Sequence, residues 1–405
     1  MANRRDKFRA YMSKLEGAAP PQLALDEGLC VDLPGRSVAG QIVTRLDLKP
    51  TSSHLLVGGI GSGKSTQLLL ATRRLNEITD THAFYVDVAL KHDLEQFQSG
   101  VLLALAGVTL SKHAESLKLK EGKEAREVLI RWARGWKEWI PDDPDDEGPP
   151  DDWEGWDSHQ VEHRGVLSPA RQPLDGNMRE AMRALNEVRA SLEATTPHLV
   201  VLFDSLDRLV SPPQTFVQQV EQDIRAIKEA GVGVALVGPL SSLFGHERAV
   251  AQYFDHIYLQ AAVDTTPGND GRAFLATILR MRDAAGMLPD DALSLVIDLS
   301  GGVLRDAINI AQRAGEEAYV AGAERVSPDH VRAAGDTLGR ELMMGLGTRE
   351  LDVLRGVSEK AEFVPSSDSD LALLVTRRVL DYGNPPLRYR LHPTLRPFLE
   401  IQAHK

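Results

Sequence analysis

The sequence predicts an α/β protein with a core built on a parallel sheet, followed by an all-helical region and a small mixed unit at the C-terminus. Between residues 54 and 260, short apolar runs typical of buried strands alternate with helix-length segments, which favours parallel strands joined by crossover helices. From residue 270 to about 344 only helical periodicity remains. Residues 346–405 then combine two helices with a hairpin pattern.

Composition bounds the class of protein. The chain has 405 residues, and its 26% charged and 42% hydrophobic residues are ordinary for a globular protein with a substantial core. A formal net charge of −12 argues against a protein that coats nucleic acid over its whole surface, although local basic patches remain compatible with it. Cys30 is the single cysteine, which excludes an internal disulfide and a cysteine-based zinc site. Because no secretory signal or membrane-length apolar run is present, we expect a cytoplasmic location.

The first 110 residues begin with helices and then alternate strand and helix. A short basic helix is predicted at residues 1–17, and a second helix at 37–46. The apolar run Leu55–Val57 predicts a buried strand, and the residues from Thr66 onward have a helical pattern. Residues 83–88 predict the next strand, followed by a helix from about residue 93.

The next region interrupts this alternation. We expect a charged helix over 112–139 that leads into residues 141–157, where nine acidic residues, four prolines and two glycines disfavour a packed element. All five tryptophans lie between residues 132 and 156, and Trp132, Trp136 and Trp139 share one helical face. Two interpretations stay open: a helix that packs its own indoles against a loop, or a docking surface or lid.

Regular α/β structure returns after this insertion. Each apolar run predicts a strand, and the amphipathic segments between them predict helices. The expected elements are a helix at 177–194, a strand at 198–204, a helix at 214–230, a strand at 233–237, a helix to about 253, a strand at 256–259 and four helices over 270–340.

Residues 54–66 read HLLVGGIGSGKST and contain the phosphate-binding P-loop spacing, Gly58, four residues, then Gly63-Lys64-Ser65. Glycines let backbone N–H groups face a polyphosphate, and the positive end of the following helix strengthens that field. Lys64 is expected to reach the β and γ phosphates, and Ser65 to ligate Mg²⁺. The alternative is a glycine-rich turn that binds nothing. The expected nucleotide-binding residues are Gly58, Gly59, Ile60, Gly61, Ser62, Gly63, Lys64, Ser65 and Thr66.

Asp204 ends the apolar run LVVLF. We expect it at the C-terminal edge of a strand adjacent to the P-loop strand, where ligands bind in parallel sheets and where a carboxylate can hold the metal's water shell. The alternative role for Asp204 is a helix N-cap.

The segment VVLFDSLDRL resembles the Walker B segment of AAA+ and STAND ATPases, and particularly that of KAP-type ATPases, in which a second acid follows three residues after the first. Asp207 occupies that position. The resemblance implies that Asp207 is the catalytic base; the alternative is a salt bridge to a local arginine such as Arg208. Ser205 stands where AAA+ enzymes usually carry glutamate, which implies slow hydrolysis unless Asp207 takes over that role.

Two downstream segments extend the resemblance. Residues 300–320, SGGVLRDAINIAQRAGEEAYV, are similar to the sensor 2 helix of initiator-like and STAND lids, which implies that Arg305 contacts the γ phosphate. The alternative is a surface arginine at a helix start. Residues 238–259 occupy the sensor 1 and arginine-finger region, and this implies that Arg248 is a finger presented to a neighbouring subunit. A solvated helix arginine is the alternative there.

The last sixty residues carry the order helix, helix, hairpin, with helices at 348–357 and 371–375 and strands at 379–382 and 387–391. This order resembles a winged helix. Six Lys or Arg against two Asp or Glu in residues 371–405 allow DNA binding, and packing on the core or on a partner is the alternative. The predicted domains are an N-terminal helix and connector (1–53), a P-loop ATPase core (54–265, with a Trp-rich acidic insertion at about 112–176), a helical lid (266–344) and a winged-helix-like domain (345–405).

Taken together, the resemblance implies a P-loop ATPase of the broad AAA+/STAND group that uses ATP and Mg²⁺. The main expectation is a slowly hydrolysing molecular switch that forms homo-oligomers through the nucleotide interface and controls a protein effector, for example in bacterial anti-phage defence. The alternative is a DNA-associated ATPase of the initiator or transposition-regulator type that uses the winged helix and the basic N-terminal helix. A third possibility is a scaffold that holds nucleotide without cleaving it.

Overall fold

The computed structural model describes residues 3–16, 21–31, 37–134, 175–209, 213–244, 250–383 and 388–403. The chain divides into two compact units. The sheet unit consists of Val38–Val57 and Leu68–Tyr258, and the lid unit consists of Met1–Ser37, Gly58–Gln67 and Leu259–Lys405. The P-loop residues therefore group with the lid unit, although they follow a strand of the sheet.

The sheet has five strands in the order β2-β3-β4-β1-β5, and the pairs β2–β3, β3–β4 and β4–β1 are parallel, as predicted. Parallel strands end at the same edge of a sheet. The chain therefore leaves β1 for the P-loop at the same edge at which β3 ends with Asp204. The expectation of adjacent strands is wrong, because β4 lies between β1 and β3. The strands are β1 (Ser53–Gly58), β2 (Thr81–Asp87), β3 (His198–Asp204), β4 (Val232–Val237) and β5 (His256–Gln260).

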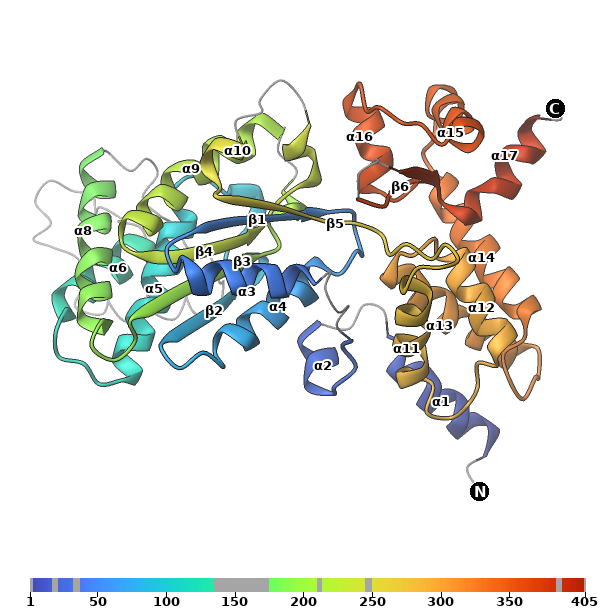
Figure 1. Ribbon diagram of the computed structural model, residues 1–405, viewed down its shortest axis with the longest axis horizontal. Helices are drawn as coiled ribbons and strands as arrows, with labels where there is room; N and C mark the ends of the chain where they lie inside the picture. Colours follow the sequence, from blue (N-terminus) through green and yellow to red (C-terminus); the bar gives the residue numbers. More distant parts are fainter. Residues whose placement is uncertain are drawn as a thin grey trace, which may run out of the picture. The chain divides into compact units, whose positions relative to one another are not determined.

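Helices cover both faces of the sheet (Figure 1). Buried apolar residues of α3 (Val38–Leu48) and α4 (Lys64–Leu75) form one core cluster with strand residues such as Leu56. The neighbouring Leu55 points to the opposite face, because side chains alternate along a strand. There it lies beside Gly238 together with Phe216 of α9 (Pro213–Glu229). The helices α5 (Val101–Ser116), α6 (Lys123–Arg134) and α8 (Asp175–Leu192) pack in the same layer as α9.

The helix predicted over residues 112–139 is two helices, so that prediction is wrong. Lys112 belongs to the last turns of α5, and the chain turns at Lys118 (φ +56°) and Gly122 (φ +70°) before α6 begins. A residue with a left-handed φ cannot be accommodated inside a right-handed helix, and this segment has two of them within five residues. Trp132 is half-buried in α6. Residues 135–174, with the other four tryptophans, lie outside the described residues, so both interpretations of that segment remain predictions.

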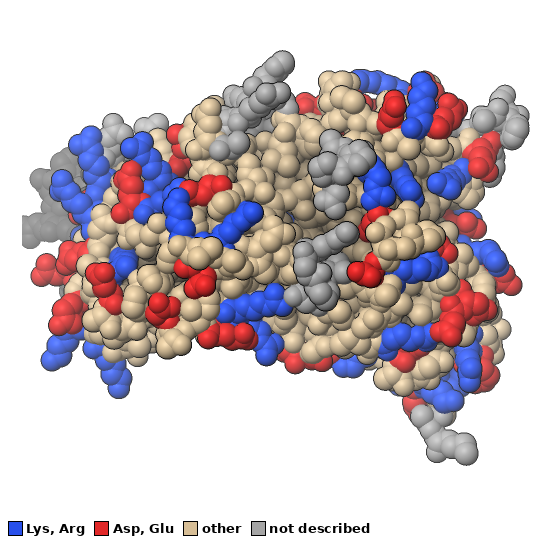
Figure 2. Space-filling view, viewed as in Figure 1, with Lys and Arg blue, Asp and Glu red and all other residues tan. Residues whose placement is uncertain are grey.

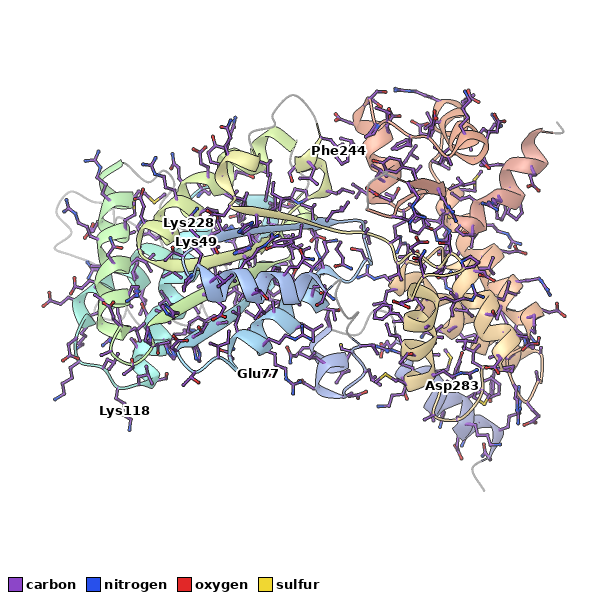
Figure 3. The ribbon with its side chains drawn as sticks, in the orientation of Figure 1. Lys49, Glu77, Lys118, Lys228, Phe244 and Asp283 are labelled. Carbon is purple, nitrogen blue, oxygen red and sulfur yellow. The ribbon has the colours of Figure 1, made fainter. Side chains whose placement is uncertain are left out.

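The segment between β4 and β5 also differs from the single helix expected there. A short 3₁₀ turn, η4 (Leu240–Leu243), follows β4, and α10 (Val250–Tyr253) precedes β5. At the start of β1, Asp255 accepts hydrogen bonds from Lys49 Nζ (2.6 Å), Lys228 Nζ (2.7 Å) and the Ser53 N–H (2.8 Å). The two lysines lie close together in Figure 3. This half-buried charge cluster joins the start of β1 to the turn before β5.

Within the lid unit, residues 271–343 form four helices where the sequence predicts them: α11 (Gly271–Arg282), α12 (Asp290–Leu299), α13 (Leu304–Val320) and α14 (Pro328–Met343). The N-terminal helix α1 (Arg4–Lys14) packs on α13, because the buried Tyr11 hydroxyl donates to Ala311 O at 2.9 Å. Arg4 Nε also donates to Ala323 O at 2.8 Å, just beyond α13. A short helix, α2 (Pro21–Asp26), follows α1.

The C-terminal segment (residues 348–403) has the predicted helix–helix–hairpin order. It contains α15 (Thr348–Lys360), α16 (Asp368–Val375) and the antiparallel strands β6 (Val379–Asp381) and β7 (Tyr389–Leu391). An additional helix, α17 (Arg396–Ala403), was not predicted. Its second residue is Pro397, which usually argues against a helix but is tolerated in the first turn. Among the described residues, no helix has both the length and the apolarity needed to cross a membrane.

Candidate functional site

The loop after β1 has the backbone of an anion-binding turn. Gly61 (φ +78°) and Gly63 (φ +97°) adopt left-handed conformations that glycine tolerates best. Gly58 is also required for space, because a Cβ there would lie 2.5 Å from Gln260 O. The geometry of this loop therefore requires glycine at positions 58, 61 and 63.

Lys64 begins α4 and is buried. Its Nζ donates to Gly58 O at 3.0 Å and to Gly59 O at 2.9 Å, so the ammonium lies against the loop. Ser62 Oγ is buried and has no hydrogen-bond partner among the described residues. Buried hydroxyls are normally satisfied, and an unsatisfied one inside a loop of this shape indicates a missing acceptor or donor such as a bound anion. Ser65 follows Lys64 in the first turn of α4.

The lid helix α13 begins beside this loop, within the lid unit. Gly301 (φ +58°) and Gly302 (φ +85°) form the predicted sharp turn, and a Cβ on Gly302 would lie 1.9 Å from Val263 O. Arg305 is the second residue of α13, as expected, and its side chain is exposed. The Arg305 N–H donates to Gly61 O at 3.3 Å, so the lid and the loop are directly bonded.

The C-terminal segment also contacts the loop, which sequence reasoning missed. The Ile60 N–H donates to Val375 O, the last residue of α16, at 3.2 Å. A Cβ on Gly61 would lie 3.1 Å from Arg377 Nη1. Arg377 is separated from the loop by the whole lid in the sequence, and its left-handed backbone (φ +67°) has no residue-type signal. No local pattern could have placed it here.

The candidate metal residue Asp204 is 2% exposed, at the end of β3 in the sheet unit. Its Oδ1 accepts the Ser205 N–H at 2.7 Å, and its Oδ2 accepts the Tyr85 hydroxyl at 2.5 Å. Burial, and then the neighbouring Asp204 carboxylate, raise the pKa of Tyr85 well above its usual value. Tyr85 therefore stays a protonated donor that orients Asp204. Sequence reasoning missed it, because a tyrosine on a strand is usually taken for packing.

Asp207 lies in the 3₁₀ turn η3 (Leu206–Arg208) directly after β3 and is half-buried. Ser205, in the place where AAA+ enzymes usually carry glutamate, has a left-handed backbone (φ +74°). A positive φ is uncommon for a residue with a side chain and is often found at functional sites. Arg248, the predicted finger, lies outside the described residues.

Comparison with known proteins identifies the lid. Residues 277–336 match the family described as the Cdc6 AAA+ ATPase-type lid domain. These residues span the second half of α11 through most of α14. No curated protein matches the sequence.

Several solved structures are similar over nearly the whole chain. The ORC2 protein of Aeropyrum pernix, in ADPNP and ADP complexes, is 15% identical, with 92% of this chain and 96% of that chain covered and a TM-score of 0.46. Cdc6p of Pyrobaculum aerophilum is 14% identical, with 96% and 98% covered and a TM-score of 0.41. The RuvB Holliday junction branch migration motor of Thermotoga maritima is 14% identical, with 90% and 95% covered and a TM-score of 0.36.

The architecture follows from the observed elements and the lid match. A loop with P-loop spacing connects a strand of the five-stranded α/β sheet to a helix. The four-helix region that matches a known lid family is hydrogen-bonded to that loop through the Arg305 N–H. The chain is therefore a P-loop α/β protein with a helical lid of the AAA+ type.

Proposed function

We propose that this chain binds ATP with Mg²⁺ at the loop after β1 and hydrolyses it. The observation that carries the proposal is the bond from the Arg305 N–H to Gly61 O, which joins an AAA+-type lid to a loop with P-loop spacing. Loop amides and Lys64 would hold the phosphates. Ser65 and Asp204 offer the oxygen donors that Mg²⁺ prefers, and Mg²⁺ typically combines one or two protein ligands with phosphates and water.

The residues beyond the loop divide the chemistry among them. Bound Mg²⁺ would neutralise charge on the phosphates. Asp207 orients and deprotonates the attacking water. It takes the role of the glutamate that AAA+ enzymes usually carry at the position of Ser205. Arg305 stabilises charge on the γ phosphate from the lid side. Tyr85 keeps the Asp204 carboxylate in one orientation through the 2.5 Å hydrogen bond.

A single-turnover assay tests this chemistry. Wild-type protein, in excess over γ-labelled ATP with Mg²⁺, is expected to release phosphate slowly. The Lys64→Ala variant should lose nucleotide binding or productive positioning, and Asp207→Asn should bind ATP without cleaving it. If the bound ATP is never cleaved, with DNA present as well, the protein is a nucleotide-held scaffold and the enzymatic part of the proposal fails.

The lid match favours the initiator-type alternative over the effector switch, because the matched family is a Cdc6-type lid. We therefore propose a DNA-associated ATPase. The control of an effector in anti-phage defence stays a prediction without a structural observation behind it.

The distribution of charge limits which residues can contact DNA. Most of the C-terminal arginines are engaged internally: Arg377 pairs with Asp306, Arg378 donates to Leu342 O and Met344 O, and Arg388 pairs with Asp264. The positive surplus counted in the sequence therefore overstates the charge available to DNA. Arg390 on β7 is exposed. On the face in Figure 2, basic and acidic side chains are interspersed.

The N-terminal helix is the stronger candidate for a DNA contact. Phe8 and Tyr11 of α1 are buried, whereas Arg5, Lys7 and Arg9 are exposed. Replacing these three cations with alanine should weaken DNA retention and flatten its salt dependence, by about 0.9 in log–log slope for each phosphate that they neutralise. The control variant carries Lys112→Ala, Lys120→Ala and Lys123→Ala, which remove the same charge from exposed positions of the sheet unit. Equally weakened retention in both variants would show that only net charge matters and would contradict the proposed contact.

We also propose that the chain forms homo-oligomers through its nucleotide-binding surface, with Arg248 as a finger in trans. Arg248→Ala should then slow turnover at high protein concentration and leave dilute monomer unaffected. An equal effect at both concentrations would argue against a finger from a neighbouring subunit.

A further inference from the structure

Arg377 lies between the phosphate-binding loop and a buried carboxylate, all within the lid unit. Its Nη1 is 3.0 Å from Asp306 Oδ1 and 3.1 Å from the position that a Cβ on Gly61 would occupy. The same Gly61 position lies 2.7 Å from Arg305 Cβ. Two arginines from different parts of the chain, the start of the lid helix and the C-terminal segment, therefore converge on one residue of the loop.

The Asp306 carboxylate holds this guanidinium imperfectly. Asp306 is completely buried in the first turn of α13, where the helix N-terminus favours a negative charge. Its second oxygen is 3.5 Å from His392 Nε2. Neither carboxylate oxygen has a partner with hydrogen-bond geometry among the described residues. An arginine paired without the bidentate geometry that makes such pairs strong is poised to exchange for a better anion.

The backbone around Arg377 connects this pair to the loop and to the hairpin. The left-handed φ of +67° at Arg377 is sparsely populated for a residue with a side chain and persists where neighbours fix it. On one side, the Ile60 N–H donates to Val375 O at 3.2 Å. On the other side, the His392 N–H donates to Arg378 O at 3.0 Å. A movement of the Arg377 side chain would thus alter the positions of both the loop and the C-terminal strands.

We propose that Arg377 is a phosphate-binding residue that exchanges between Asp306 and the terminal phosphates of a bound nucleotide, and so couples nucleotide binding to the C-terminal segment. The inference rests on the proposed binding of ATP at this loop. A triphosphate presents several charged oxygens to Arg377. When the arginine leaves, Asp306 still lies in the first turn of α13, where the helix N-terminus favours its negative charge. Because Arg377 pairs with Asp306 when it is not on the nucleotide, Asp306 competes with the nucleotide for one guanidinium.

Competition gives the two partners opposite effects, and the test uses this. Mg²⁺–ATP binding is measured by equilibrium titration on the full chain, with thermal unfolding of every variant. Arg377→Ala should weaken binding about ten- to a hundred-fold, the loss expected for one charge-assisted hydrogen bond. Asp306→Asn, which removes the competing charge with little change in shape, should tighten binding several-fold. Arg378→Ala is the matched control, because this adjacent arginine donates to carbonyls at the end of α14 and should leave affinity unchanged.

A residue with a purely structural role would not give this pattern, since both substitutions would then weaken binding. Arg377→Gln, which keeps much of the packing of the stem, should weaken binding as Arg377→Ala does. Hydrogen exchange adds a second measurement: ATP should change exchange in residues 368–381 of the wild type and not of Arg377→Ala. Unchanged or tighter ATP binding by Arg377→Ala would overturn the inference.

Failure of the inference and failure of the proposed function are distinguishable. If the wild type binds ATP, Lys64→Ala abolishes binding and Arg377→Ala has no effect, only the role of Arg377 is refuted. If the wild type does not bind ATP and Lys64→Ala changes nothing, the proposed function is refuted and the inference falls with it.

Discussion

Replacing Tyr85 with phenylalanine removes the hydroxyl that donates to Asp204 Oδ2 at 2.5 Å and leaves the ring in place. Asp204 is 2% exposed, so water cannot readily replace the missing donor. A hydrogen bond to a charged group contributes about 1.5–3 kcal/mol. The Ser205 N–H remains on Oδ1, and we therefore expect the lower end of that range, about 1.5 kcal/mol, as the loss in orienting the carboxylate.

That loss should be measurable in the dependence of hydrolysis on Mg²⁺. If Asp204 holds the metal, about 1.5 kcal/mol corresponds to roughly a ten-fold higher Mg²⁺ concentration at half-maximal rate. Changes of about this size are typical when a partner of a metal-binding side chain is removed. The assay is single-turnover hydrolysis at fixed ATP over a titration of Mg²⁺, with the rate at saturating Mg²⁺ measured separately.

Tyr258→Phe provides the control. It also removes a tyrosine hydroxyl hydrogen-bonded within the sheet unit, to His54 Nδ1 at 2.9 Å near the start of β1. The control should cost stability without changing the Mg²⁺ requirement. An unchanged Mg²⁺ requirement in Tyr85→Phe, at a stability loss equal to that of the control, would refute the reasoning that places Asp204 at the metal.

Two further predictions concern the scaffold. Gly302→Ala should lower the unfolding temperature of the lid unit sharply, because the new Cβ would lie 1.9 Å from Val263 O in a left-handed backbone. Gly286→Ala is the control, because Gly286 also has a left-handed backbone (φ +63°) but no atom within 4 Å of the new Cβ. It measures the backbone part of the loss in stability, about 1–2 kcal/mol. Burial, followed by the neighbouring His256, lowers the pKa of His54 to about 3. Below about pH 6.5, His54 binds a proton in the unfolded chain but stays neutral in the folded chain. The unfolding free energy should therefore fall by about 1.4 kcal/mol for each pH unit below that pH. Denaturant titrations at pH 5 and pH 7 should show a smaller difference in His54→Gln than in the wild type.

Most of the elements could be predicted from local pattern. Apolar runs ending in Gly58, Asp204 and Val237 indicate buried strands because both faces of the sheet are covered by helices. The errors lie where local pattern is weak. The break between α5 and α6 depends on a left-handed Lys118. The second residue of α17 is Pro397, and a proline usually argues against a helix.

The candidate site was predictable only in part, for a physical reason. The loop glycines and Lys64 could be found because the spacing of a P-loop is dictated by the phosphates it surrounds. Tyr85 and Arg377 could not, because their roles arise from contacts between residues far apart in the sequence. The charge of the C-terminal segment was likewise misleading, since the pairing of Arg377 with Asp306 and of Arg388 with Asp264 cannot be read from composition.

The most direct measurement is hydrogen exchange of the wild-type chain with and without Mg²⁺–ATP, followed in three peptides: residues 58–67, residues 199–205 and residues 303–312. If the loop, Asp204 and the start of α13 bind a metal-bound triphosphate, exchange should become slower in all three peptides of the wild type. In Lys64→Ala, ATP should change exchange in none of them. Exchange that stays the same in residues 58–67 at saturating ATP would contradict the account.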